Sequence, residues 1–203
     1  EKASGAFRGG DTRRKASIRG YSGKSAGGNV GDKVEIASGG SYVIRFQDTG
    51  FWLAKYAARK GYHKPTGTIA LNYCNNLRIF RYAETLLAYA ELVGVEGVAE
   101  QKGISAQQCL DMVRDRAFGD TNHRVAVNKQ NIINENHYEF VGEGHRYYDV
   151  VRWGITEVLN VDNVPGINSA RTWKSHNKYV AIPQGDIDAT KGTEFELKQN
   201  EGY

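Results

Sequence analysis

The segment that most constrains the fold runs from residue 76 to residue 93 and reads NLRIFRYAETLLAYAELV. It is rich in alanine and leucine, which are good helix formers, and Gly94 follows it as a typical helix stop. At helical spacing its charged side chains form one stripe, and apolar side chains cover most of the remaining surface. These apolar residues are Leu77, Ile79, Phe80, Tyr82, Leu86, Leu87, Tyr89 and Ala90. A helix so broadly apolar must pack on more than one side, so we expect a helix over 76–93 within a mainly helical protein.

A second helix is predicted over residues 105–118. It begins with Ser105 and Gln108 at the spacing of a capping box, in which each side chain satisfies a free backbone amide of the other residue. Gly119 ends the segment. The predicted inner face carries Cys109, Met112, Val113 and Arg116.

Third and fourth helices are predicted over residues 128–141 and 145–153, with Gly142 and Gly144 breaking the chain between them. The inner face of the third helix would carry Ile132, Ile133, His137, Phe140 and Val141. In the fourth helix we expect Tyr148 and Trp153 to lie in the core. The short connections favour packing of the four helices as two antiparallel pairs.

The segments on either side of these helices are irregular. Ten of the 24 glycines fall within residues 1–40, and we interpret residues 1–75 as a loop-rich segment. Short extended pieces are expected there at 34–37 and 41–46, joined by a turn at Gly39-Gly40. The helical core then occupies 76–160. A loop and carboxy-terminal segment, 161–203, contains a short strand or extended piece at 178–182, followed by a turn and a single helical turn within 183–188.

Composition excludes several classes of protein. A chain of 203 residues with 40% apolar content can bury a core without disulfides or metals. No apolar run is long enough to span a bilayer as a helix, and no signal peptide is visible.

Cys74 and Cys109 lack the spacing of a zinc site or of a redox pair. Buried free thiols are favoured for both, and one disulfide between them remains an alternative. The net charge of +4 includes a short basic cluster before residue 25, which fits a solvated loop better than a nucleic-acid site.

Several long strings, found in order along the chain, resemble those of one protein family. They are RIFRYAETLLAYAEL, VRDRAFG, NENHYEFVGEGHRYYDVVRWG, KYVAIPQGDID and a terminal QNEGY. The early Asp11-Thr12-Arg13 also resembles the Asp-Pro-Arg that often opens the same region. Together they resemble the carboxy-terminal half of the SusD/RagB family, outer-membrane nutrient-binding lipoproteins of Bacteroidetes-type bacteria.

The resemblance implies a fold, a function and partners. The fold would be mainly helical, with tetratricopeptide-like helix pairs, long irregular loops and a few short strands. The function would be non-catalytic capture of oligosaccharides at the cell surface and their delivery to a SusC-like TonB-dependent outer-membrane transporter, with no cofactor and no metal. Family members are longer and lipid-anchored through an amino-terminal segment, so the missing amino-terminal half is a further expected partner, whereas nucleic acid is not.

Sugar binding requires aromatic faces that stack on pyranose rings and polar groups that hydrogen-bond to ring hydroxyls. The loop-rich segment is the richest source of both. We therefore predict a glycan site there, formed by Trp52, Tyr21, Tyr42, Tyr62, Arg45 and Asp48. A loop around Trp173, with Arg171 and Lys174 beside it, suits a partner contact instead.

Three alternatives remain open. The protein could be a peptide-binding member of the family, or a helical scaffold that docks to the transporter while another part carries the ligand. A glycan hydrolase is a remote alternative, in which His145 and Asp149, four residues apart on one helix, act as an acid and base pair. The structural interpretation of this motif places Glu143 at a helix start and pairs Asp149 with Arg146 or Arg152.

Overall fold

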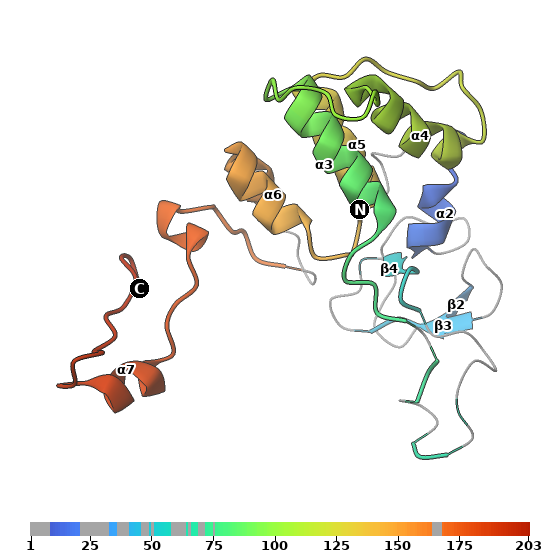
Figure 1. The fold of residues 1–203 in the computed structure, drawn as a ribbon. Coiled ribbons are helices and arrows are strands. Elements are labelled where there is room, and N and C mark those ends of the chain that lie inside the picture. Colours follow the sequence, from blue (N-terminus) through green and yellow to red (C-terminus); the bar gives the residue numbers. More distant parts are fainter. Residues whose placement is uncertain are drawn as a thin grey trace. The chain divides into compact units, whose positions relative to one another are not determined.

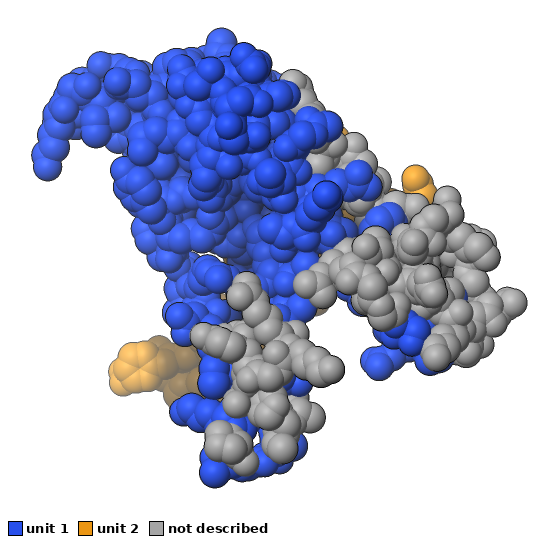
Figure 2. All heavy atoms as spheres, turned by 90° about the vertical axis from the view of Figure 1, so that its right-hand side faces the viewer, with its two compact units in different colours: residues 1–146 blue, residues 147–203 orange. Residues whose placement is uncertain are grey.

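The computed structural model describes residues 9–20, 33–35, 41–45, 49, 51–57, 64, 66–68, 72–74, 76–163 and 168–203. The chain forms two compact units, Glu1–Arg146 and Tyr147–Tyr203, which are coloured separately in Figure 2. The first unit contains the short helix α2 (Arg13–Ser17), the strands β1 (Ile18–Gly20), β2 (Lys33–Glu35), β3 (Ser41–Val43) and β4 (Phe51–Leu53), and the helices α3 (Tyr82–Gly94), α4 (Ala106–Phe118) and α5 (Lys129–Glu139). Helix α6 (Arg146–Trp153) begins at the boundary, and the 3₁₀ helices η1 (Thr156–Leu159) and η2 (Ser175–Lys178) and helix α7 (Gln184–Thr190) follow. The described part is mainly helical, as predicted.

Helix α3 begins at Tyr82, so the prediction of a helix from residue 76 was wrong for its first six positions. Arg81 is extended, with φ −151° and ψ 158°, and its guanidinium group binds carboxylates on and after α5. These contacts hold Arg81 outside the helix, so the preceding residues extend away from it. Leu77, Ile79 and Phe80 are consequently exposed rather than packed.

The core of the first unit forms where α3 packs against both α4 and α5 (Figure 1). The predicted pairing of the first two long helices is confirmed, but α5 joins the same core instead of forming a separate pair. Buried apolar side chains from all three helices and from the residue after α5 meet there. They are Ala83, Leu86, Leu87, Ala90, Cys109, Leu110, Val113, Ile132 and Phe140.

Helix α4 carries the predicted capping box. The Ser105 hydroxyl accepts a hydrogen bond from the Gln108 amide at 3.1 Å, and the Gln108 side chain accepts one from the Ser105 amide at 2.8 Å. Gly119 ends the helix in the left-handed conformation, with φ 77°. The predicted inner face was partly wrong, because Met112 and Arg116 are exposed. The buried face is rotated toward Leu110, Arg114 and Ala117, which lie beside Cys109 and Val113.

Helix α5 has Asn128 as its amino-terminal cap, and Ile132 and Ile133 are buried as predicted. Val141 and His137 are only half-buried. Burial lowers the pKa of His137 to about 4, with a smaller contribution from the charge of Arg146. The buried face of α5 also contains Glu135 and Glu139, which the sequence analysis did not place there.

In the second unit, Trp153 is buried as predicted, but Tyr148 is 74% exposed, so its assignment to the core was wrong. Residues 179–182 form no strand. Tyr179 is extended, as the other form of the prediction for 178–182, an extended piece, allows. Helix α7 is longer than the single helical turn that the sequence predicts.

The strands form two antiparallel pairs within the first unit. β1 pairs with β4, so that Ile18 faces Leu53, and β2 pairs with β3, so that Val34 faces Tyr42. The predicted extended pieces at 34–37 and 41–46 thus correspond to a pair of shorter strands, while the expected turn at Gly39-Gly40 lies outside the described residues. The sequence analysis missed β1 and β4.

Both cysteines are free. Cys109 is buried, as expected, and burial raises the pKa of its thiol, whereas Cys74 is exposed, so the expectation of burial was wrong for it. Among the described residues, no helix combines the length and apolar content needed to cross a membrane.

Candidate functional site

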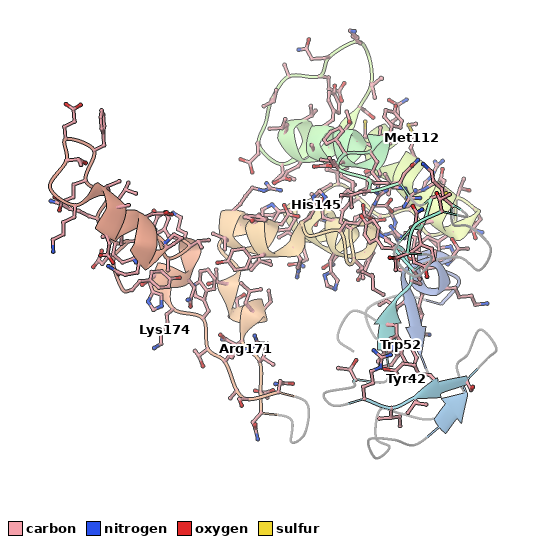
Figure 3. The ribbon with its side chains drawn as sticks, turned by 90° about the horizontal axis from the view of Figure 1, so that it is seen from below. Tyr42, Trp52, Met112, His145, Arg171 and Lys174 are labelled. Carbon is pink, nitrogen blue, oxygen red and sulfur yellow. The ribbon has the colours of Figure 1, made fainter. Side chains whose placement is uncertain are left out.

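Three of the six predicted glycan-site residues lie together in the first unit. The rings of Tyr42 and Trp52 pack edge to face with centroids 4.5 Å apart, and the guanidinium group of Arg45 lies 5.9 Å from the Tyr42 ring centroid. Figure 3 shows Tyr42 on β3 and Trp52 on β4 side by side. Both rings are half-buried and Arg45 is exposed. The other three predicted residues, Tyr21, Tyr62 and Asp48, lie outside the described residues.

This aromatic cluster, Tyr42, Trp52 and Arg45, has the chemistry that a sugar site requires. Aromatic rings offer flat apolar surface to the C–H face of a pyranose, and a guanidinium group offers several hydrogen-bond donors in a fixed plane. The two rings come from strands of different sheets, so each contributes a differently oriented surface. Ligand contact by these residues stays a prediction.

Beside the strands, a buried network of ion pairs joins the amino-terminal part of the unit to the helices. Arg13 binds Asp11 at 2.7 Å and Glu135 at 2.5 Å, and Arg114 binds the second oxygen of Glu135 at 2.5 Å. The side chain of Glu135 is fully buried, and those of Asp11, Arg13 and Arg114 are nearly so. Helix α2 is therefore tied to α4 and α5 by charges that water does not reach.

The same network extends through Glu139 and Glu143. Arg81 binds Glu139 at 2.5 Å and Glu143 at 2.7 Å, and Arg116 binds Glu139 at 2.6 Å. Lys55, two residues after β4, forms an ion pair with Glu143. A contact of 3.1 Å between Arg13 and Glu139 connects this half to the first.

The electrostatics of the network follow from its geometry. Burial by itself would raise the pKa of Glu139, but hydrogen bonds and charge from Arg116 and Arg81 outweigh it and lower the pKa to about 2. The pKa of Glu143 is also lowered, because Arg81 and Lys55 outweigh the effect of its burial. Burial lowers the pKa of Lys55 despite its hydrogen bond to Glu143. Each of these charged groups is thus held by a partner of opposite charge.

The residues of the hydrolase alternative have other partners. His145 stacks on Phe140 with ring centroids 4.7 Å apart, and its Nδ1 atom lies 3.7 Å from a Glu84 oxygen. Asp149 accepts a hydrogen bond from Arg152 at 3.1 Å, which confirms the structural interpretation of that residue. Glu143 belongs to the ion-pair network instead of acting mainly at a helix start. Within the described part of the chain, no cluster of His, Cys, Asp and Glu side chains could hold a metal ion.

The loop around Trp173 is fastened inside the second unit. The Trp173 amide donates a hydrogen bond to the Asn160 side chain at 2.7 Å, and its ring lies 5.9 Å from that of Tyr147. Arg171 and Lys174, labelled in Figure 3, are exposed on the same loop. A partner contact through this loop stays a prediction.

The buried carboxylates of α5 are the functional feature that the sequence analysis missed. A signal for them exists, because Ile132, Glu135 and Glu139 follow each other at spacings of three and four residues and so share one helical face. Two acids at core spacing indicate buried partners of opposite charge.

The sequence as a whole matches one known protein family. A sequence model of the SusD family matches residues 1–203, which is the whole chain. The chain belongs to the SusD family. The resemblance to this family and the SusD-like fold are thereby confirmed. SusD-family proteins are non-catalytic binding proteins. The hydrolase alternative does not fit this family.

Solved structures of similar proteins show the same fold. The surface glycan-binding protein A from Bacteroides fluxus is 50% identical, with a TM-score of 0.81 over 100% of this chain and 39% of that one. The surface glycan-binding protein A from Bacteroides thetaiotaomicron in complex with laminarihexaose is 35% identical, with a TM-score of 0.75 over 98% of this chain and 40% of that one. A SusD-like protein from Formosa agariphila is 33% identical over 91 residues, which are 41% of this chain and 16% of that protein. The chain thus spans about two-fifths of the length of these solved structures.

The lowered pKa of Glu139 predicts a loss of stability in acid. Its pKa is about 2 in the folded protein and near 4.5 in an unfolded chain, so the carboxylate stabilises the fold above pH 4.5 and stops doing so as the pH falls toward 2. We expect the free energy of unfolding to fall by about 3 kcal/mol across this window from this group. Urea unfolding followed by circular dichroism at a series of pH values measures it.

The variant Glu139→Gln should be less stable at neutral pH and should depend less on pH within that window. Glu100→Gln, which removes an exposed carboxylate, is the matched control and should behave as the parent does. An unchanged acid dependence in Glu139→Gln would show that this carboxylate does not carry the effect.

Proposed function

We propose that this protein captures oligosaccharides at the cell surface, binding them without chemical change. Support comes from its membership of the SusD family and from two relatives that are named surface glycan-binding proteins. One of those relatives is described in complex with laminarihexaose, so this hexasaccharide is the first ligand to test.

The observation that carries the proposal is the aromatic cluster. Tyr42 and Trp52 pack against each other from two strands, and Arg45 lies over Tyr42. In this proposal a sugar ring stacks on exposed aromatic surface, and Arg45 donates hydrogen bonds to ring hydroxyls. Binding then needs only shape and hydrogen bonding, in agreement with a family that performs no catalysis.

The proposal includes a location and a route for the ligand. The protein is held at the outer membrane by a lipid anchor in an amino-terminal segment and passes its ligand to a SusC-like TonB-dependent transporter. The resemblance to SusD/RagB proteins supports this part of the proposal. The chain itself then acts as the carboxy-terminal part of a longer protein.

An exposed apolar segment supports this last point. Leu77, Ile79, Phe80 and Tyr82 lie within six consecutive residues, and each is exposed by 64% or more. Contiguous apolar surface of this kind usually marks a contact site. Because the chain spans 39% of the Bacteroides fluxus structure, we assign the remainder of a full-length protein as the occupant of this surface.

Labelling of a cysteine at position 79 tests this assignment. In a Cys74→Ser background, Ile79→Cys should react readily with a maleimide in the 203-residue chain and about tenfold more slowly in the full-length protein, where the segment is covered. Ala99→Cys, at another exposed position, should react equally in both. Equal reactivity at position 79 in the two proteins would contradict the assignment.

Alanine substitutions of the aromatic cluster test ligand binding. In the full-length protein, Trp52→Ala and Tyr42→Ala should each weaken laminarihexaose binding about tenfold or more, because each removes a stacking surface; this corresponds to about 1.4 kcal/mol. Isothermal titration calorimetry measures the affinity, and circular dichroism checks the fold.

Phe195→Ala removes an exposed aromatic ring of the second unit and serves as the control. Unchanged affinity in folded Trp52→Ala and Tyr42→Ala variants would favour the scaffold alternative, in which another part of the protein holds the ligand. Binding of peptides without binding of any oligosaccharide would favour the peptide-capturing alternative.

A further inference from the structure

Strand β4, which carries Trp52, is short and pairs with one strand, β1, in the part of the chain that the structure describes. It contains three residues, and its partner strand β1 is equally short. One further backbone hydrogen bond, from the Ala54 amide to the Ser17 carbonyl at 2.7 Å, continues the pairing. Two-stranded pairs of this length are marginal by themselves, so other contacts must hold β4 in place.

The first such contact lies on the face of β4 opposite Trp52. Successive side chains of a strand point to opposite faces, so Leu53 points away from the face that carries Trp52. Leu53 packs against Gly142, where an added Cβ atom would lie only 2.1 Å from its Cδ1 atom. Gly142 also has φ 76°, a conformation that favours glycine. The strand therefore lies directly against the turn that follows α5.

The second contact is Lys55, which fastens the end of the strand to the same turn. Its ammonium group donates a hydrogen bond to the Glu139 carbonyl at 2.5 Å and forms an ion pair with Glu143. Glu143 is in turn held by the guanidinium group of Arg81 at 2.7 Å. The Lys55 side chain is only 17% exposed, so this connection is largely shielded from water.

We infer that the Lys55–Glu143 ion pair is a positioning device for Trp52 in the predicted glycan site; the inference rests on the proposed function. Lys55 and Leu53 hold β4 against the turn after α5 and thereby direct Trp52 toward Tyr42. Because the Lys55 ammonium group is bound to the Glu139 carbonyl and to Glu143, Lys55 acts on a ligand through the strand and not by contact.

A double-mutant cycle tests the inference. In the full-length protein, Lys55→Met should weaken laminarihexaose binding about fivefold, because Trp52 is no longer held in one orientation. Lys55→Met should have little further effect in a Trp52→Ala background, since its influence passes through that ring. Glu143→Gln provides a second variant at the other end of the pair, and Arg124→Met, which breaks an exposed ion pair with Asp115, is the control.

A measurement without ligand separates this inference from the proposed function. In protein labelled with 5-fluorotryptophan, the ¹⁹F resonance of Trp52, assigned with Trp52→Phe, should shift or broaden in Lys55→Met, while those of Trp153 and Trp173 stay unchanged. An unchanged Trp52 resonance in a folded Lys55→Met variant would overturn the positioning role. An equal loss of affinity from Lys55→Met with and without Trp52 would also overturn it. Full affinity in Trp52→Ala would instead overturn the proposed glycan site.

Discussion

The first unit depends on charges that are paired and, apart from the exposed Arg116, largely buried. Its network joins carboxylates before α2, on α5 and after α5 to cations from four parts of the chain. The carboxylates are Asp11, Glu135, Glu139 and Glu143, and the cations are Arg13, Lys55, Arg81, Arg114 and Arg116. Moving such groups out of water is unfavourable by several kcal/mol per ion, so each is tolerated only while its partners remain in place. The network consequently specifies which segments meet, even where apolar contact between them is small.

The candidate binding surface follows from this constraint. Arg13 ties α2, and with it β1, to the helices, and Lys55 ties the end of β4 to the turn after α5. Trp52 lies on β4, which pairs with β1 and ends two residues before Lys55. The loop-rich part of the chain can therefore present Trp52 while a charged interior holds its strand. The proposed capture of oligosaccharides needs such a surface and no reactive group.

The sequence predicted local structure where local signals decide it. The capping box at Ser105, the glycine stop at Gly119 and the buried Ile132 and Phe140 all depend on residues within one or two helical turns. The prediction was wrong where distant contacts decide. Arg81 continues the helical pattern of its neighbours, yet its binding to Glu139 and Glu143 keeps it extended.

The candidate site was predictable in composition but not in arrangement. Aromatic and basic residues in the loop-rich segment indicated sugar chemistry, and Tyr42, Trp52 and Arg45 do lie together. Their proximity depends on two separate strand pairs and on the attachment of β4 to the helices, neither of which leaves a pattern in a few neighbouring residues. The buried charges of α5 were missed because acids are normally assigned to helix surfaces.

The coupling between Arg13 and Glu135 tests the central role of the buried network most directly. Each of the variants Arg13→Met and Glu135→Met should lower the free energy of unfolding by about 3–5 kcal/mol, because each leaves a buried charge without its partner. The double variant should lose less than the sum of the two, because neither Arg13 nor Glu135 is then left facing an empty position. Asp11 and Arg114 each lose a partner in a single variant and again in the double variant, so their loss cancels in the comparison. Urea unfolding of the four proteins gives the coupling energy. Small, additive losses of about 1 kcal/mol or less, as found for surface ion pairs, would contradict the account.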